Sequence, residues 1–253
     1  MAKGHGAKGL AHLADFLDSH GVLRVPIRKL RRQRRARRRH AHRYEVGGYW
    51  GELGKLQLDF LTSQGLEPTS RFLDVGCGTL RAGVHLADYL DPGNYYGIDI
   101  DEQLLTTGYT LELSAEQRQK VPRDHLRCTD RFDVDFGVQF DQAIAQSVFT
   151  HISFNDIRLC LYRVARHMKI GGKFFVTFVE APPDFPLDGV LYQERERSSS
   201  TRGPRKRYTE RNPFWYWPGD LEWAASFAPW RFRYVGDWGH PRNQKMVELI
   251  RTP

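Results

Sequence analysis

Between residues 71 and 179 the sequence alternates short apolar runs with segments of helical periodicity, and this alternation restricts the possible folds more than any other feature. Strands that alternate with helices form βαβ units, which build a parallel sheet covered by helices on both faces. We therefore predict an α/β fold with a doubly wound, mostly parallel sheet. The expected strands of this part are residues 71–76, 95–100, 125–129, 140–148 and 173–179.

Helical spacing of apolar residues predicts helices between most of these strands, over residues 80–90, 101–113 and 153–169. The last of these helices should begin with Ser153 as its N-cap and should end at Gly171 and Gly172. An amphipathic segment over residues 48–65 predicts one more helix, which leads into the sheet.

The alternation of strands and helices stops after the fifth expected strand. Residues 181–218 are rich in Pro, Arg, Ser and aromatic residues, and we expect them to form an insertion on the substrate side. A short helix over 219–227 and two strands, 230–238 and 244–251, should follow. We assign one domain to residues 44–253 and treat residues 1–43 as a basic N-terminal extension that is partly helical or disordered.

The positive charge of the chain is concentrated in one segment of this extension. Residues 24–43 hold 11 of the 38 Lys and Arg residues and no Asp or Glu, so the rest of the chain carries 27 basic and 30 acidic residues. An Arg-rich segment of this kind suits a nucleic acid or an anionic membrane surface, and many such segments have no specific partner.

Several cellular locations are disfavoured by the sequence. No apolar run approaches the ~20 residues of a transmembrane helix, and no apolar segment follows the N-terminal charges as a secretion signal requires. The three cysteines, Cys77, Cys128 and Cys160, lack the spacing of a zinc site. Because all three lie in apolar segments, we expect buried thiols in a reducing compartment, and hence a cytoplasmic protein.

The segment LDVGCGTLRAG joins the first expected strand to a helix and carries the strongest functional signal. Gly76 and Gly78 let the backbone turn tightly and let a ligand approach without a Cβ in the way. Asp99 ends the next strand, where a carboxylate can accept hydrogen bonds from both hydroxyls of a ribose. A dinucleotide fingerprint would need a third glycine at Arg81, and no G-x-x-x-x-G-K-[ST] motif for a triphosphate is present.

The segments FLDVGCGTLRAGVHL, YYGIDIDEQLL and FDQAIAQSVFTHI, with LYRVARHMKIGGKFFVTF, resemble class I S-adenosylmethionine-dependent methyltransferases over about residues 70–180. The resemblance implies a Rossmann-like, seven-stranded sheet with one antiparallel strand, in which the two C-terminal strands form the closing hairpin. It also implies S-adenosylmethionine as the cofactor.

The resemblance assigns cofactor contacts to residues near the ends of the first four strands. Gln146 would lie beside the sulfonium. Arg81, in the first turn of the helix after the glycine loop, could pair with the methionine carboxylate or form a surface ion pair. The remaining contacts are Asp74, Gly76 and Gly78 around the methionine part, Asp99 at the ribose, and Asp130 with Arg131 or Phe132 at the adenine edge.

Motifs of several substrate classes are missing. Enzymes that methylate amines and amides with a [D/N/S]-P-P-[Y/F/W] tetrad carry it after the fourth strand, where this chain has QSVF. NPFW (212–215) imitates the tetrad, but it follows the fifth strand and lacks the second proline, so we interpret it as coincidence. Only Glu180 and Asp184 could supply acidic metal ligands at the strand ends, and we expect no bound metal.

Two histidines are candidates for contact with the acceptor. His151 follows the fourth strand, and because an imidazole titrates near neutrality we predict that His151 is the catalytic base. His240 lies in the turn between the last two strands, ~14 Å from the fourth strand by strand spacing, and its better role is to bind the acceptor. Either residue could instead have a local structural role, at a helix start or in a turn.

Aromatic residues gather in the segment that leaves the fifth strand. An aromatic loop at this place suits a sugar or a planar ring, although the same rings could equally seal the core under a long loop. From this cluster we assign acceptor binding to Tyr208, Trp215 and Trp217. The whole sequence resembles actinobacterial enzymes of specialised or glycan metabolism, many of which act on hydroxyls.

We therefore predict O-methylation of a hydroxyl on a sugar, a glycan or a natural-product small molecule. The alternative is methylation of RNA or another nucleic acid, which the segment Arg28–Arg43 would bind. A third hypothesis is a protein that binds the cofactor but has no activity. Against the alternative, the Arg-rich segment has no interleaved aromatic residues and the rest of the chain is slightly acidic. Peripheral contact with an anionic membrane is also compatible with the segment.

Overall fold

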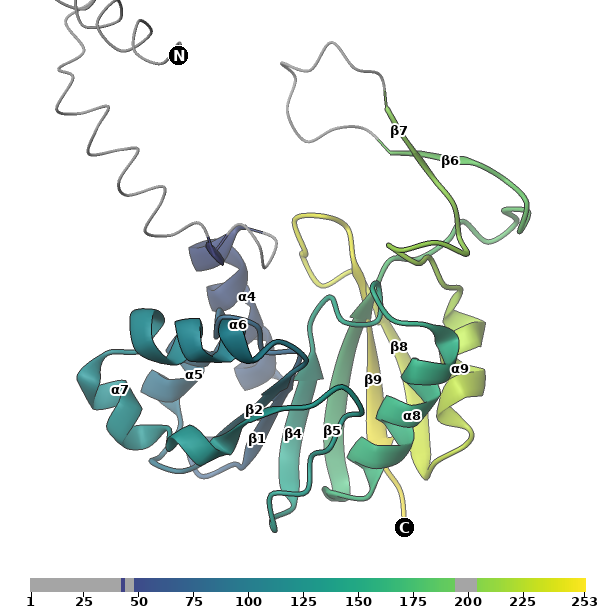
Figure 1. The fold of residues 1–253 in the computed structure, drawn as a ribbon. Helices are drawn as coiled ribbons and strands as arrows, with labels where there is room; N and C mark the ends of the chain where they lie inside the picture. The colour runs from purple at the N-terminus through teal and green to yellow at the C-terminus, as the bar shows by residue number, and fades with distance from the viewer. Residues whose placement is uncertain (1–41, 44–47, 194–203) are drawn as a thin grey trace, which may run out of the picture. The chain divides into compact units, whose positions relative to one another are not determined.

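The computed structural model describes residues 42–43, 48–193 and 204–253 (Figure 1). The described residues from 48 onward belong to one compact unit, Val46–Pro253. The expected basic extension, residues 1–43, lies outside the described residues apart from its last two. The tip of the expected insertion, residues 194–203, also lies outside them.

A seven-stranded sheet forms the centre of the unit, in the order β3-β2-β1-β4-β5-β9-β8. The first five strands are parallel, and β9 runs antiparallel to both of its neighbours, β5 and β8. This confirms the predicted mostly parallel sheet with one antiparallel strand. The strands are β1 (Phe72–Val75), β2 (Tyr95–Asp99), β3 (Leu126–Cys128), β4 (Phe140–Ala145), β5 (Met168–Phe178), β8 (Trp230–Gly236) and β9 (Lys245–Arg251).

Helices cover both faces of the sheet and enclose two hydrophobic cores (Figure 1). Successive side chains of a strand point to opposite faces, so Leu73 of β1 joins one core and Phe72 joins the other. The core of Leu73 includes α8 (Phe154–Ala165) and α9 (Pro218–Ala225). The core of Phe72 includes residues of α4 (Trp50–Ser63), α5 (Gly83–Tyr89) and α6 (Glu102–Thr107), with α7 (Ala115–Lys120) beside α5.

Some boundaries differ from those that the sequence predicted. Ser153 caps α8 as expected, since its Oγ accepts the backbone N–H of Asp156 at 3.3 Å. However, α8 ends at Ala165 and not at Gly171, because Met168 already pairs with Phe140 as the start of β5. The helix expected over 101–113 is α6 followed by a π-helical turn, η1 (Gly108–Glu112), and a short 3₁₀ helix, η2 (Arg123–His125), precedes β3.

The insertion contains a second, two-stranded antiparallel sheet that the sequence did not predict, formed by β6 (Leu191–Gln193) and β7 (Arg205–Arg207). The segment after β7 lies across the carboxyl ends of β4 and β5. Its backbone is fixed there because Phe214 N–H donates to the carbonyl of Thr150 at 2.8 Å and Tyr216 N–H donates to that of Val179 at 3.0 Å.

The three cysteines are free thiols, but they are not all buried. Cys77 and Cys160 lie in the two cores, whereas Cys128 is exposed at the carboxyl end of β3. The expectation for Cys128 was wrong because Cys128 is the last residue of β3, which is an edge strand of the described sheet. Within the described ranges, every helix is too short or too polar to cross a lipid bilayer.

Candidate active site

The loop after β1 depends on two glycines in the left-handed backbone region. Gly76 has a φ of 73° and Gly78 a φ of 54°, which other residues adopt only at a cost. A Cβ at Gly76 would lie 2.3 Å from Cγ2 of Val148, in the segment after β4. Glycine at this position therefore allows the loop to pack against the end of β4, and the two together form one edge of the candidate site.

Asp99 holds this loop from the end of β2. Its Oδ2 accepts the backbone N–H of Gly78 at 2.8 Å, and its Oδ1 accepts that of Asp101 at 3.0 Å. Burial raises the pKa of Asp99, and the backbone donors oppose the rise. Because a carboxylate offers about four acceptor positions, Asp99 keeps the capacity to accept two hydroxyls of a ligand.

Asp74 and Arg81 form a buried charge cluster beside the loop. The hydroxyl of Tyr95 donates to Oδ2 of Asp74 at 2.9 Å. Burial raises the pKa of Asp74 to about 7, and the hydrogen bond from Tyr95 and the positive charge of Arg81 oppose this rise. Burial also lowers the pKa of Arg81 to about 10, while the negative charge of Asp74 raises it.

Arg81 also contacts the segment that precedes α4. Its Nη1 donates to the carbonyl oxygen of Gly48 at 3.3 Å. The guanidinium of Arg242, from the turn between β8 and β9, lies 5.2 Å from the ring centre of Tyr49. The charges of Arg81 and Arg242 act on each other and on His240. Two guanidinium groups at this end of the site suit a ligand carboxylate, the group that the sequence assigned to Arg81.

A buried group of polar side chains surrounds Gln146, just beyond β4. Oε1 of Gln244 accepts hydrogen bonds from the hydroxyls of Ser147 and Thr177, both at 2.9 Å. Nε2 of Gln146 lies 3.2 Å from the same oxygen and 3.1 Å from Nε2 of His240. The second polar atom of the Gln146 carboxamide is buried and has no hydrogen-bond partner among the described residues. This atom is therefore available to a ligand.

His240 reaches further towards β4 than the strand order indicates. β8 lies three strands from β4, but the turn after β8 folds back and brings His240 against Gln146. The distance of ~14 Å expected from strand spacing is thus wrong for this side chain. Nδ1 of His240 accepts the backbone N–H of Arg242 at 3.1 Å. Burial, with the charges of Arg81 and Arg242, lowers the pKa of His240 to about 4, so the ring is neutral near pH 7.

His151 follows β4 and is exposed, and its contacts differ from those of His240. Its Nδ1 lies 2.8 Å from Oδ1 of Asn212, in the insertion. An amide oxygen only accepts hydrogen bonds, so Nδ1 carries the proton and Nε2 keeps its lone pair. The geometry therefore leaves His151 Nε2 able to accept a proton at the carboxyl edge of the sheet.

The residues expected at the adenine edge follow β3 and lie next to the end of β2. The backbone N–H of Thr129 donates to the carbonyl of Asp99 at 2.8 Å, and Oγ1 of Thr129 accepts the N–H of Arg131 at 3.2 Å. Asp130 and Arg131 are exposed, and Phe132 is partly buried. These contacts place the segment 129–132 beside Asp99, as a ligand that joins an adenine to a ribose requires.

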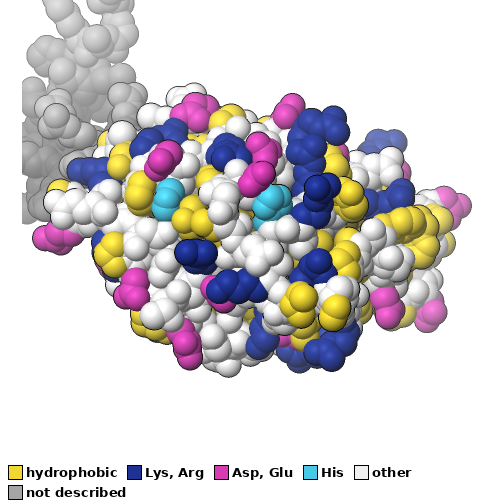
Figure 2. All heavy atoms as spheres, turned by 90° about the horizontal axis from the view of Figure 1, so that it is seen from below, with side chains coloured by type: hydrophobic (Ala, Val, Ile, Leu, Met, Phe, Trp, Pro, Cys, Tyr) yellow, Lys and Arg dark blue, Asp and Glu magenta, His cyan; other side chains and the backbone are white. Residues whose placement is uncertain are grey.

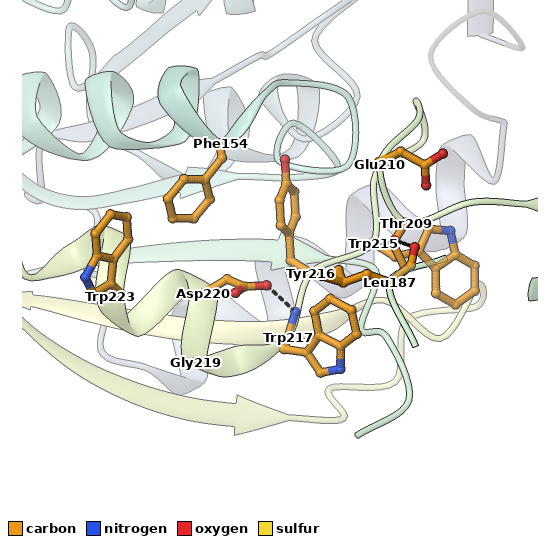
Figure 3. Close-up of a pocket in the computed structure, with 10 residues that line it drawn as sticks. All are labelled: Phe154, Leu187, Thr209, Glu210, Trp215, Tyr216, Trp217, Gly219, Asp220 and Trp223. Atoms are coloured by element: carbon orange, nitrogen blue, oxygen red, sulfur yellow. Dashed lines mark hydrogen bonds between the residues drawn. The ribbon is translucent and has the colours of Figure 1, made fainter. Parts of the chain in front are cut away.

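A cavity of about 450 Å³ lies between the insertion and helices α8 and α9 (Figure 3). Of the three residues assigned to acceptor binding, Trp215 and Trp217 line it. Tyr208 does not, and its ring instead lies 4.8 Å from the guanidinium carbon of Arg211. The residues that line the cavity include the aromatic residues Phe154, Trp215, Tyr216, Trp217 and Trp223 and the acidic residues Glu210 and Asp220.

Several residues of the site were not found from the sequence. Thr177 is a polar residue inside the apolar strand KFFVTFV, and that interruption was the available signal. Asn212 belongs to the NPFW segment that was interpreted as coincidence. Gln244 and Arg242 lie in a turn whose path back to β4 has no local sequence signal.

These groups fit S-adenosylmethionine. The glycine loop, Asp99 and the segment after β3 provide contacts for the adenosine, and the guanidinium groups of Arg81 and Arg242 suit the carboxylate of the amino acid. Gln146 adds a buried side-chain atom that has no hydrogen-bond partner among the described residues. No group of three or more His, Cys, Asp or Glu residues suited to a metal ion occurs within the described ranges.

Comparison with known proteins gives a domain match and a similar fold. Residues 73–174 match the family model of a methyltransferase domain. The fold is similar to that of an S-adenosylmethionine-dependent methyltransferase from Clostridium acetobutylicum, with a TM-score of 0.57 and 13% identity over 87% of this chain and 99% of that one.

Two further similar structures are described as methyltransferases of a sugar and of an amino pentose. One is a sugar N-methyltransferase from a Streptoalloteichus species, with a TM-score of 0.57 and 17% identity over 83% of this chain and 91% of that one. The other is an amino pentose methyltransferase from Micromonospora echinaspora with bound S-adenosylmethionine, with a TM-score of 0.57 and 18% identity over 84% and 96%. Residues 73–174 therefore match a methyltransferase domain, and the fold is that of S-adenosylmethionine-dependent methyltransferases.

Proposed function

We propose that the enzyme transfers a methyl group from S-adenosylmethionine to a hydroxyl group of a sugar, in a glycan or in a small natural product. The aromatic cavity beside the carboxyl ends of β4 and β5 carries this proposal (Figure 3). The two similar structures that act on a sugar and on an amino pentose agree with a sugar acceptor.

The cavity has the size and chemistry that a sugar needs. Its volume of about 450 Å³ lies within the ~300–1,000 Å³ that is usual for small-molecule sites. Aromatic rings pack against the apolar C–H face of a sugar, and the carboxylates of Glu210 and Asp220 can accept hydrogen bonds from its hydroxyls. The backbone bonds of Phe214 and Tyr216 to Thr150 and Val179 hold this wall at the strand ends.

A hydroxyl acceptor also needs a group that takes its proton. Bound S-adenosylmethionine supplies an electrophilic methyl group, and the chain must orient the acceptor oxygen and accept its proton. We assign the proton to Nε2 of His151, whose other ring nitrogen is bonded to Asn212. His240 is neutral, and its Nδ1 already accepts the backbone N–H of Arg242, so we do not assign the acceptor proton to it.

Assay of matched acceptors tests the function directly. Labelled S-adenosylmethionine would be incubated with sugars that carry a hydroxyl and with the same sugars that carry an amine at one position. Mass spectrometry of the products should show the methyl group on oxygen. Methylation of the amine alone would overturn the assignment to hydroxyls, and transfer to nucleic acid alone would overturn the sugar acceptor.

Removal of one aromatic wall of the cavity should weaken acceptor binding. We expect Trp217→Ala and Trp223→Ala each to raise the KM for the sugar by about fivefold to thirtyfold, since loss of a ring contact removes about 1–2 kcal/mol of binding energy. Affinity for S-adenosylhomocysteine, measured by calorimetry, should not change. The matched control is Tyr162→Ala, which removes an exposed ring of α8 that does not line the cavity. Unchanged KM values in both tryptophan variants would place the acceptor elsewhere.

The alternative function, methylation of a nucleic acid, depends on the Arg-rich segment 28–43. Only His42 and Arg43 of this segment are described. The body of the chain lacks a matching charge, because residues outside 24–43 hold 27 basic and 30 acidic residues. Figure 2 shows the end of the unit opposite to the candidate site, where Lys and Arg are interspersed with Asp and Glu. A nucleic-acid enzyme usually continues a basic surface to its catalytic site.

Deletion of residues 1–43 separates the two functions. We expect the shortened chain to keep methyl transfer to a small acceptor and to lose salt-sensitive binding to polyanions, because counterion release requires clustered positive charge. The measurements are turnover on a sugar and on RNA, and retention on heparin, at low and high salt. Loss of RNA methylation with no other change would make nucleic acid the acceptor.

A further inference from the structure

We propose that Asn212 is a positioning residue that holds His151 in the tautomer able to accept a proton. The inference rests on the proposed function, which makes His151 the base. Asn212 comes from the insertion and lies outside residues 73–174, the part that matches the methyltransferase domain. The insertion thus supplies a side chain to the catalytic group as well as a wall of the acceptor cavity.

The hydrogen bond between the two side chains defines the tautomer. Oδ1 of Asn212 lies 2.8 Å from Nδ1 of His151. A neutral imidazole has one N–H and one bare nitrogen, and the group bonded to one nitrogen decides which is which. Since the amide oxygen can only accept, the proton is on Nδ1 and the lone pair is on Nε2. With the opposite tautomer, His151 would present an N–H to the acceptor and could not take its proton.

Other contacts also hold the insertion beside His151, so a role of Asn212 in positioning can be separated from a role in folding. The backbone N–H of Phe214 donates to Thr150 at 2.8 Å, and the hydroxyl of Tyr216 donates to the carbonyl of Ile152 at 2.9 Å. Tyr216 is buried and its ring packs in one of the two cores. Asn212, by contrast, is exposed, and loss of its amide leaves these anchors intact.

The hydrogen bond between Asn212 and His151 has a defined role in the proposed reaction. As the acceptor oxygen takes the methyl group from the sulfonium, whose S–CH₃ bond breaks to leave neutral S-adenosylhomocysteine, the hydroxyl proton passes to Nε2 of His151. The imidazolium that results keeps its Nδ1–H bond to Asn212, and because His151 is exposed it can release the proton to water. The amide does not exchange protons in this step. Its part is to fix the ring orientation and the site of the lone pair.

Three variants and one spectroscopic measurement test the inference. Asn212→Leu removes the acceptor at similar size, Asn212→Asp keeps an oxygen, and Asn155→Leu makes the same change at an exposed position of α8. The ring ¹⁵N shifts of His151, assigned by comparison with His151→Ala and recorded at a pH at which the ring is neutral, report its tautomer. We expect a proton on Nδ1 in the natural chain, in Asn212→Asp and in Asn155→Leu, and a shift towards Nε2–H in Asn212→Leu.

Activity should follow the tautomer. We expect Asn212→Leu to lower kcat about tenfold, a part of the ~10²-fold contribution of a general base, with less than about a twofold change in either KM. Asn212→Asp should restore most of the loss, and Asn155→Leu should behave as the natural chain.

The outcomes distinguish this inference from the function on which it rests. A proton on Nε2 in the natural chain would overturn the role of Asn212, and so would Asn212→Leu with unchanged ¹⁵N shifts and kcat. Normal turnover of His151→Ala would instead overturn the base assignment, whatever the spectra show.

Discussion

His151→Ala is expected to lower kcat by about 10²-fold or more, with little change in the affinity for S-adenosylhomocysteine. The reason is that Nε2 of His151 is the site that we assign to the acceptor proton, and its Nδ1 is held by Asn212 at 2.8 Å. A residue that acts only while the proton moves affects kcat and kcat/KM together and leaves cofactor binding unchanged. Steady-state kinetics with the sugar acceptor and calorimetry with S-adenosylhomocysteine measure the two quantities separately.

The control for this variant is His167→Ala. His167 directly precedes β5, at the opposite end of the sheet, where its Nδ1 lies 3.8 Å from a carboxylate oxygen of Asp135. Its removal should leave kcat within about twofold. If His151→Ala keeps near-normal turnover between about pH 6 and pH 9, His151 is not the base. Orientation of the two reactants would then be the main source of rate enhancement.

The sheet could be predicted because its pattern is local and repeated. Each parallel strand is buried on both faces and leaves an apolar run in the sequence, and each crossover helix leaves a period of 3.6 residues. The closing hairpin, β8 and β9, was also recognisable from its two strand-like runs and the turn between them. The antiparallel direction of β9 came from the family resemblance and was confirmed by its pairing with β5.

The boundaries that were missed depend on pairing between distant parts of the chain. Gly171 and Gly172 look like the end of a helix, but Met168 is drawn into β5 by its pairing with Phe140, and Gly171 provides a positive φ within that strand. The small sheet of β6 and β7 pairs Leu191 with Arg207 across a long connection, and neither short strand has an alternating apolar pattern of its own.

The residues that we propose to bind the cofactor could be named from the sequence, whereas their contacts with one another could not. Gly78 and Asp99 follow from a motif with fixed spacing, and the structure joins them at 2.8 Å. The contact of His240 with Gln146 depends on how the β8–β9 turn folds back over two strands, and the contact of His151 with Asn212 depends on an insertion. Such long-range contacts leave no local pattern for sequence analysis to detect.

Asp99→Ala should weaken binding of S-adenosylhomocysteine by about 1–3 kcal/mol, or about fivefold to 150-fold. Two losses add in this variant. The ribose hydroxyls would lose their carboxylate acceptor, and the glycine loop would lose the bond between Gly78 N–H and Oδ2. Asp99→Asn should fall between Ala and the natural chain, because its single carbonyl oxygen cannot accept both the Gly78 and the Asp101 N–H groups while also serving a ligand. Calorimetry gives the affinities, and thermal unfolding checks that each variant is folded.

Asp101→Ala separates the cofactor role of Asp99 from a general effect of lost negative charge. Asp101 is exposed and caps α6, where its Oδ1 accepts the N–H of Gln103 at 2.8 Å, and its backbone N–H still reaches Asp99 in the variant. Loss of this cap should cost about 1 kcal/mol of folding stability and leave cofactor affinity within about twofold. A lower Tm with unchanged affinity in Asp101→Ala, beside weakened binding in Asp99→Ala, would place the ribose at Asp99. If both variants bind S-adenosylhomocysteine as tightly as the natural chain does, the ribose binds elsewhere and Asp99 serves only to hold the glycine loop.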